Sequence, residues 1–433
     1  MAMDGKELVE KLAKLSQVQS IKDIPQLTHA LFPGTHCPLM GAAMAVGGIK
    51  DSLIVVVGTD ECTYYTKSMT IHSEKFGGIG GRCISVVLDD HDVTFGSAEK
   101  VQEAFKEIIE EYRPQCVFLV TTCVIEIIGD DFDAISEGLS KLYGIPVLPV
   151  HTEHFKCEDH LPGLERTITV CAEMMKSCDC DNSVNLLGQR MGDFATTELY
   201  AMLQKAGVKI GLQLPCGCSV DDIKNAAAAK VNIVVNDIAL PLAQKMQEKF
   251  GIPYVYFNKF VIPEKIYEAY KNLFGYLELE LPEELEGLYQ NAREKIEKNK
   301  GELEGITYIY GNTPYAVFEM NCFLSSLGMV PQVIQTNRYT EADEPYAKEI
   351  LQYTDPYVCK AANIAPLQYV YDVLSPYLYL GHEFGNRLRQ KGIAIVHSDR
   401  ASGMLGFEVT GYLLQQLVKS VREAKEYRKE LGL

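Results

Sequence analysis

The sequence has no apolar run long enough to cross a membrane. Its longest strongly apolar segments, such as residues 53–57, are far shorter than the ~20 residues that a membrane-spanning helix needs. The N-terminal segment mixes acidic and basic side chains and lacks the apolar core of an export signal. We therefore expect a protein without a membrane span that stays in the cytoplasm.

Basic residues are scarce relative to acidic ones. The chain has 41 lysines and arginines against 58 aspartates and glutamates, which gives a formal net charge of −17. A surface of this sign repels the phosphates of nucleic acids, so the composition argues against a nucleic-acid-binding protein. A length of 433 residues, with 47% hydrophobic and 23% charged residues, is typical of a globular chain of roughly two to four domains.

Cysteine pairs of the C-x-x-C type are absent, although the chain has 13 cysteines. A cytoplasmic chain of this length is not expected to build a disulfide framework, so its thiols are either reduced or metal ligands. Most free cysteines pack as small apolar residues. Each candidate metal ligand therefore has to be judged from its surroundings.

Short apolar segments rich in β-branched residues alternate with helical segments along the whole chain. Because the apolar segments are continuous, they indicate strands covered on both faces, and hence parallel sheets. We predict an α/β fold of three Rossmann-like, doubly wound parallel-sheet domains at 1–182, 183–300 and 301–433, the last with a closing helix at about 404–431. The predicted strands are 52–58, 83–88, 116–122, 146–150, 184–188, 208–214, 231–235, 253–257, 306–311, 330–336, 377–381 and 393–398.

Three cysteines fall in loops beside predicted strand ends. Cys37 lies in an irregular segment before a helix of small residues, whereas Cys62 and Cys123 each follow a buried strand. Three dispersed thiolates of this kind fit an iron-sulfur cluster that takes its fourth ligand from another subunit. Three unrelated core thiols are the alternative that the spacing leaves open.

The residues around these cysteines resemble a known family. The strings CPLMGAAMAVGG (37–48), DVTFGSAEK (92–100) and TTCVIEIIGDD (121–131) are similar to nitrogenase component 1 proteins. These include molybdenum-iron protein subunits, cofactor-assembly scaffold subunits and dark protochlorophyllide reductase subunits. The resemblance implies an electron-accepting iron-sulfur cluster, of the 4Fe-4S type or the 8Fe P-cluster type, at a subunit interface. It assigns the cluster ligands to Cys37, Cys62 and Cys123.

The same resemblance implies a second site between the domains, where this chain differs from the molybdenum-iron α subunit. Asn236 aligns with the cysteine that anchors the active-site cofactor, so that thiolate is missing, whereas His397 aligns with the histidine ligand. Cys216 and Cys218 follow a predicted strand and open a helix, whose N-terminus would lower their pKa values and let them replace the missing ligand. A tight turn with incidental thiols is the alternative.

Other residues of this second site are assigned by alignment as well. His160 aligns with an active-site glutamine and is, like His397, a candidate proton donor. Gly311 and Pro314 align with the loop that covers the cofactor, although Tyr315 replaces the arginine expected beside that proline. The histidine-rich segment 151–163 offers zinc ligands as a competing interpretation, but its spacing is not that of a structural zinc site.

We therefore predict a nitrogenase-like oxidoreductase subunit. It would accept electrons from an ATP-dependent iron-sulfur reductase through the interface cluster and reduce a substrate at an inter-domain metallocluster. Two alternatives stay open: a non-enzymatic scaffold on which a nitrogenase-type metallocluster is assembled, and a subunit that reduces a tetrapyrrole. The expected partners are the reductase and a homologous subunit, in a homodimer or a heterotetramer.

Overall fold

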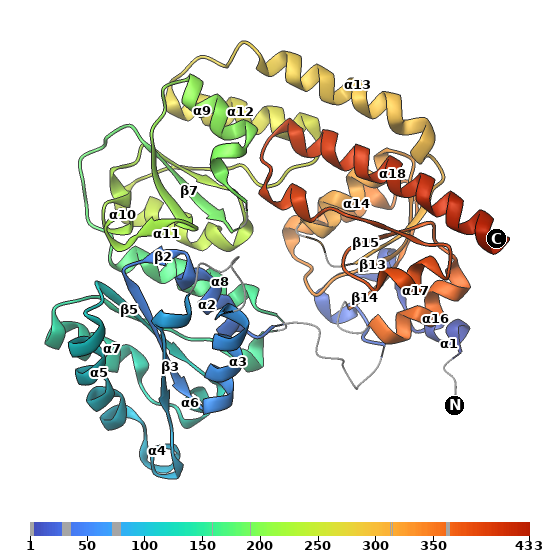
Figure 1. Ribbon diagram of the computed structural model, residues 1–433. Coiled ribbons are helices and arrows are strands. Elements are labelled where there is room, and N and C mark those ends of the chain that lie inside the picture. Colours follow the sequence, from blue (N-terminus) through green and yellow to red (C-terminus); the bar gives the residue numbers. More distant parts are fainter. Residues whose placement is uncertain are drawn as a thin grey trace.

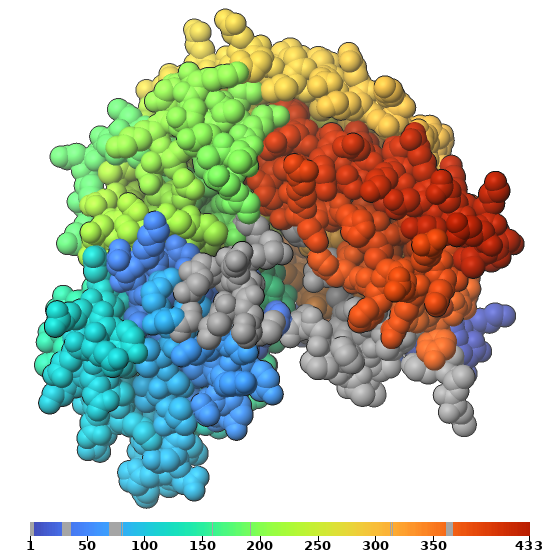
Figure 2. All heavy atoms as spheres, in the orientation of Figure 1, coloured from blue at the N-terminus to red at the C-terminus, as the bar shows by residue number. Residues whose placement is uncertain are grey.

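The computed structural model describes residues 4–27, 36–71, 79–157, 159–190, 192–311, 313, 315–360 and 364–433. Within these residues the strands form three larger sheets and a two-stranded ladder. Each larger sheet forms one lobe, and the second lobe, green in Figures 1 and 2, contacts both of the others. No helix in the described ranges is both long enough and apolar enough to cross a membrane.

The first sheet is parallel throughout, in the order β4-β3-β5-β6. Odd-numbered residues of β3 pack against α5 and α7 on one face, and even-numbered residues pack near α2 and α8 on the other. This burial of both faces explains why the segment is a continuous apolar run. The elements of this lobe are β3 (Ser52–Gly58), β4 (Cys83–Val87), β5 (Cys116–Thr121), β6 (Val147–Val150), α2 (Pro38–Gly47), α3 (Asp60–Ile71), α4 (Asp90–Phe95), α5 (Ala98–Tyr112), α6 (Cys123–Ile128), α7 (Phe132–Tyr143) and α8 (Leu161–Val170).

The second sheet is also parallel, in the order β11-β10-β7-β8. Its elements are β7 (Val184–Gln189), β8 (Ile210–Pro215), β10 (Val231–Val234), β11 (Tyr254–Tyr256), α9 (Glu198–Lys205), α10 (Val220–Lys224), α11 (Leu240–Phe250) and α12 (Pro263–Leu277). A short ladder of β2 (Ile49–Lys50) and β9 (Cys218–Ser219) links this lobe to the first. The long helix α13 (Leu285–Leu303) then leads to the third lobe and packs beside α18 (Figure 1).

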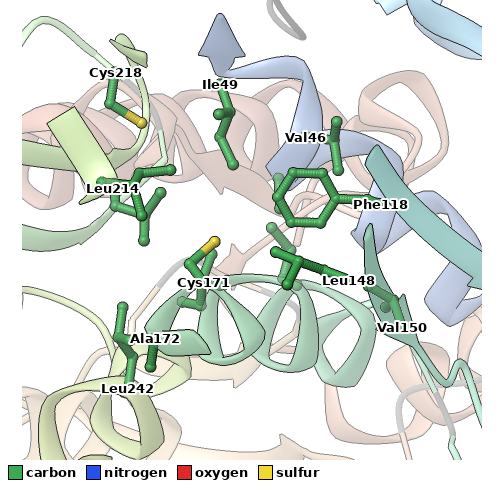
Figure 3. Close-up of a cluster of buried hydrophobic side chains, with 14 of the residues drawn as sticks. Val46, Ile49, Phe118, Leu148, Val150, Cys171, Ala172, Leu214, Cys218 and Leu242 are labelled. Carbon is green, nitrogen blue, oxygen red and sulfur yellow. The ribbon is translucent and has the colours of Figure 1, made fainter. Parts of the chain in front are cut away.

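The first two lobes share one hydrophobic core (Figure 3). It extends from Phe118 of the first sheet to Leu214 of the second. Where α2 and α8 cross, a Cβ at Gly41 would lie 1.9 Å from the His160 carbonyl oxygen, and a Cβ at Gly163 would lie 1.8 Å from the carbonyl oxygen of Pro38. Only glycine permits so close a crossing, which holds these two helices of the first lobe tightly together beside the shared core.

The third sheet has the order β1-β14-β13-β12-β15-β16, with β1 antiparallel to β14 and the other pairs parallel. Its strands are β1 (Ala13–Lys14), β12 (Thr307–Tyr310), β13 (Val330–Gln335), β14 (Tyr357–Cys359), β15 (Leu378–Leu380) and β16 (Ala394–Val396). The helices of this lobe are α1 (Gly5–Glu10), α14 (Val317–Ser326), α15 (Glu344–Ile350), α16 (Ile364–Leu374), α17 (Gly385–Arg389) and α18 (Phe407–Leu431).

The N-terminal segment belongs to the third lobe in space, which corrects the predicted first domain of residues 1–182. β1 pairs with β14, and α1 packs on α16. Leu8 and Leu12 are buried in the same core as Val333 and Val370. The amphipathic N-terminal helix buries its apolar side on the third sheet, so both ends of the chain lie on this lobe (Figure 1).

The predicted fold class, with three doubly wound parallel-sheet domains, is confirmed by the sheet topology. Each predicted strand coincides with an observed strand to within a few residues. The prediction missed β14 and the two-residue strands β1, β2 and β9. These are too short for a periodic signal in the sequence.

Candidate metal centre and inter-domain site

The three cysteines predicted as cluster ligands lie at the beginnings of three helices. Cys37 is the N-cap of α2, Cys62 lies in the first turn of α3, and Cys123 is the first residue of α6. All three are half-buried. Because β3 and β5 are neighbouring parallel strands, the helices that follow them begin at the same edge of the sheet.

A close contact holds the ends of β3 and β5 together. The Thr122 hydroxyl donates a hydrogen bond to the Val57 carbonyl at 3.0 Å. A Cβ at Gly58 would lie only 2.1 Å from the Thr122 hydroxyl oxygen, so a larger residue would force the strand ends apart. This contact fixes the position of Cys62 relative to Cys123.

Electrostatic coupling indicates that the three thiols gather at one place. Burial raises the pKa of the Cys123 thiol, and nearby Cys62 and Cys37 raise it further. Like charges have this effect only at short range. Among the described residues, no group of three ligand atoms within 4.8 Å of one another includes a cysteine.

A carboxylate on α6 fixes the loop that follows β6. One Glu126 carboxylate oxygen accepts hydrogen bonds from the Thr121 hydroxyl at 2.7 Å and the Thr152 hydroxyl at 3.2 Å. The backbone N–H of Glu153 donates to the same oxygen at 2.7 Å. Arg166 of α8 donates to the Thr152 carbonyl at 2.6 Å and pairs with the Glu153 carboxylate at 2.5 Å. The loop is thereby tied both to the helix that carries the third cysteine and to α8.

The C-x-C segment does not provide two acidic thiols at a helix N-terminus. Cys218 is 1% exposed and lies in the core shared by the first two lobes (Figure 3). Burial raises the pKa of Cys218 to about 12 and also raises that of Cys216, so the predicted lowering is wrong. Helix α10 begins only at Val220. Cys216 is half-buried, and its thiol donates to the Arg190 carbonyl at 3.2 Å.

Two residues aligned with the cofactor site have evident structural contacts. The Asn236 side-chain oxygen accepts a hydrogen bond from the Ile238 N–H at 3.2 Å and caps the short helix that follows. A Cβ at Gly311 would lie 2.3 Å from the Tyr379 hydroxyl oxygen, so this glycine lets the tyrosine pack. Pro314 lies outside the described residues. Cofactor binding by these positions stays a prediction.

The two histidines predicted as proton donors lie on different lobes. His160 is the N-cap of α8 and is half-buried. Burial lowers its pKa, and the charge of Arg190 lowers it further. His397 follows β16 and is exposed, and its carbonyl accepts a hydrogen bond from the Tyr412 hydroxyl at 3.5 Å. Their catalytic roles stay predictions.

The carboxyl edge of the second sheet carries charged residues that the sequence analysis missed: Lys259 is buried, Arg190 half-buried and Asp237 exposed. Arg190 follows β7, Asp237 follows β10 and Lys259 follows β11. Lys259 is 7% exposed. Burial lowers the pKa of Lys259 to about 8, Arg190 lowers it further, and Asp237 raises it. Their position within three residues of the end of an apolar strand is the sequence signal that could have identified these charged residues. Glu126 could have been identified in the same way, because it lies three residues after Cys123, a predicted cluster ligand.

The first and third lobes add charged side chains to the same region. Glu319 of α14 is 5% exposed, and burial raises its pKa to about 7, while Lys265 lowers it and Asp237 raises it. Burial also raises the pKa of Glu165 on α8, which Arg338, after β13, lowers from across the lobes. Side chains of all three lobes therefore meet beyond the carboxyl ends of the strands, where such folds bind ligands.

Comparison with known proteins gives a consistent family match. The model of the family described as nitrogenase component 1 type oxidoreductase matches residues 37–422. The nitrogenase iron-molybdenum cofactor biosynthesis protein NifE of Clostridium pasteurianum is 31% identical over 224 residues, which cover 51% of this chain and 49% of that protein. NifE of Rippkaea orientalis is 25% identical over 331 residues, covering 73% of this chain and 69% of that protein.

The chain is also similar to a molybdenum-iron protein alpha chain and to a solved nitrogenase structure. The nitrogenase molybdenum-iron protein alpha chain of Methanosarcina barkeri is 24% identical over 330 residues, covering 72% of this chain and 62% of that protein. The solved structure "Nitrogenase Cp1 at pH 6.5" has a TM-score of 0.79 at 15% identity, covering 93% of this chain and 95% of that chain. At that identity the structural likeness concerns the fold. The alignment with the Clostridium relative spans about half of its length.

Proposed function

Because the chain belongs to the nitrogenase component 1 type oxidoreductase family, we propose that it is an electron-accepting subunit of a nitrogenase-like reductase. Cys37, Cys62 and Cys123 hold an iron-sulfur cluster at its interface with a homologous subunit. The observation that carries this proposal is the gathering of three half-buried, coupled thiols at the joined ends of β3 and β5. A cluster bound there supplies one-electron transfer.

The chemistry of the donor set supports this proposal. Iron-sulfur clusters are held by thiolates, and these three thiols are free and partly accessible. Cys116 and Cys171, by contrast, are 0% exposed and have pKa values raised by burial. Such sealed thiols are poor ligands because a ligand must be deprotonated and reachable.

The surroundings of the three thiols support a subunit interface. A four-iron cluster with three cysteines lacks one ligand, which a partner can supply. Tyr64 and Tyr65, close behind Cys62 on α3, are 66% and 69% exposed, and Ile127 on α6 is 71% exposed. Large exposed apolar side chains beside a reactive site are typical of a surface that a partner covers. We propose a homologous subunit there and an ATP-dependent iron-sulfur reductase as the electron donor.

An anaerobic iron and sulfide count, with an EPR spectrum of the reduced protein, tests the proposed ligands. We expect Cys123→Ala to lose the cluster signal and most of the bound iron, because a ligand is missing. Cys83→Ala is the matched control, since Cys83 lies 3% exposed in the same lobe and should keep both. Unchanged iron content in Cys123→Ala would contradict the proposal.

A scaffold for metallocluster assembly is the second candidate function. Asn236 stands where the resemblance places a thiolate anchor, and its side chain caps a short helix instead. A second cluster that lacks this thiolate would be held loosely, as a scaffold that releases its cluster requires. Two of the relatives are named as cofactor biosynthesis proteins. Incubating the loaded protein with a cofactor-free molybdenum-iron protein separates the candidates: a scaffold transfers its second metallocluster and activates the recipient, whereas a reductase subunit retains what it binds.

A further inference from the structure

The segment that joins the first lobe to the second carries a pair of exposed thiols, Cys178 and Cys180. All 13 cysteines lie in the described ranges, and the other members are buried or half-buried. Residues 176–182 are all exposed, so neither thiol of this pair is part of an apolar core. Buried cysteines pack as small apolar residues, whereas exposed thiols are open to reaction. A packing role therefore does not account for this pair.

Backbone hydrogen bonds hold both ends of the segment on the second lobe. The Lys176 N–H donates to the Lys224 carbonyl at 2.9 Å, and the Asp181 N–H donates to the Ala228 carbonyl at 2.8 Å. One Asp181 carboxylate oxygen accepts a hydrogen bond from the Ser183 N–H at 3.0 Å. The two cysteines therefore lie on a short loop with fixed ends, which keeps both sulfurs at one place on the surface.

The spacing of the pair permits a direct bond between the two sulfurs. Two Cα atoms separated by one residue lie at most about 7 Å apart, and disulfides join Cα atoms that are roughly 4.4–6.8 Å apart. A small bend of the loop is therefore enough to bring the sulfurs into bonding range. A structural zinc ion needs a closed set of side-chain ligands, and two thiols supply only part of one. Thiol–disulfide chemistry needs nothing more than the pair.

The two thiols differ in their hydrogen bonding. The Cys178 thiol donates to the Lys176 carbonyl at 3.2 Å, a contact that retains the proton on this sulfur. Among the described residues the Cys180 sulfur has no such acceptor. Because the thiolate is the nucleophile in disulfide exchange, Cys180 is the thiol that reacts first, and Cys178 is the thiol that resolves the product.

We propose that Cys178 and Cys180 form a redox-active dithiol that exchanges with a small linear disulfide. The Cys180 thiolate attacks one sulfur of this co-reactant and releases its other half, which takes up a proton and leaves as a thiol. Cys178 then loses its proton, attacks the Cys180 sulfur and releases the second half as a thiol. One protein S–S bond replaces two S–H bonds, and two electrons and two protons reduce the co-reactant. This activity goes beyond the proposed function, because it uses none of the cluster ligands.

Peptide mapping of the cluster-loaded protein tests the proposal. The protein is incubated anaerobically with bis(hydroxyethyl) disulfide as the probe, quenched with an alkylating reagent, unfolded and digested with trypsin. Cleavage after Lys176 and Arg190 gives a peptide, residues 177–190, that holds both cysteines of the pair and no other. We expect this peptide to lose two hydrogen atoms and to escape alkylation. The mixed adduct should stay below about one tenth of the peptide, because the resolving thiol is present at a high effective concentration.

Single substitutions test the two roles. Cys178→Ser should stop at the mixed adduct on Cys180, because no neighbouring thiol is left to displace it. Cys180→Ser should form its adduct at least about tenfold more slowly, because the remaining thiol is hydrogen-bonded. Cys83→Ala, at a position that is 3% exposed, is the control and should close the disulfide as the parent does.

A parent peptide that stays reduced, or that carries two separate adducts, would overturn the proposal. Equal rates of adduct formation in Cys178→Ser and Cys180→Ser would overturn the assigned order of attack. The same mapping in Cys123→Ala separates this inference from the proposed function. Disulfide formation at the parent rate in that variant, with the iron lost, supports the dithiol independently of the cluster.

Discussion

The buried ammonium of Lys259 destabilises the folded chain, and its replacement by methionine should remove that cost. Methionine keeps an unbranched side chain of similar length and carries no charge. Lys259 is 7% exposed, and no described residue forms an ion pair with it. Without ligand, Lys259→Met should therefore be more stable than the parent at pH 7, because an unpaired buried charge is lost.

The magnitude follows from the pKa of Lys259, which burial lowers from its ordinary 10.5 to about 8. Each pH unit corresponds to about 1.4 kcal/mol, so the folded state disfavours the charged form by about 3 kcal/mol relative to the unfolded state. Below pH 8 both states carry the proton, and the full cost is present. Between pH 8 and 10.5 only the unfolded state still binds it, so the stability of the parent rises and the cost disappears.

The assay compares the free energies of unfolding of parent and variant in urea at pH 7, 8, 9 and 10. The advantage of Lys259→Met should be about 3 kcal/mol at pH 7 and should shrink steadily above pH 8. Lys271→Met, at an exposed position, controls for the loss of a lysine as such. A variant that is less stable at pH 7, or an advantage that stays constant up to pH 10, would refute the reasoning.

Two further substitutions test how the site is held. Glu126→Ala removes the acceptor of three donors and should cost about 1–3 kcal/mol, with faster hydrogen exchange in the 151–157 loop. Glu126→Gln keeps an acceptor oxygen and should lose less stability than Glu126→Ala. Equal losses of stability in the two variants would contradict the role of the Glu126 oxygen as the shared acceptor. Gly163→Ala places a Cβ 1.8 Å from the Pro38 carbonyl and should destabilise by about 1–3 kcal/mol in thermal unfolding. Gly138→Ala, whose Cβ meets open space on α7, should be neutral or stabilising, and similar losses in both would refute the close helix crossing.

The three-sheet fold could be predicted because its signals are local. The continuous apolar run of β3 arises from burial on both faces, and the same pattern marks the other central strands. The positions of Cys62 and Cys123 just beyond buried strands could be predicted from the strand ends, although both residues lie at the start of a helix and not in a loop. The three residues of β14 carry no periodicity, and nothing local indicates that residues 13–14 pair with them from the far end of the chain.

The inter-domain site could be predicted only in part, because its character depends on tertiary packing. Cys218 looked like a ligand at a helix start, yet its backbone pairs with Ile49 and its side chain enters a core shared by two lobes. Arg190 and Lys259 are separated by many residues, and their electrostatic coupling becomes visible only when the sheet brings them to one edge. Burial, rather than sequence position, sets the pKa values in both cases.

The association state of the cluster-loaded chain tests the interface cluster most directly. Three cysteines leave a four-iron cluster one ligand short, and subunits tied by a shared cluster gain assembly free energy from it. Sedimentation velocity of the anaerobically reconstituted protein, followed at the absorbance of the cluster, should show that absorbance in an assembly of at least two chains, and Cys62→Ala should lose both the absorbance and the assembly. A monomer of 48.3 kDa that carries the full cluster absorbance would contradict the proposal.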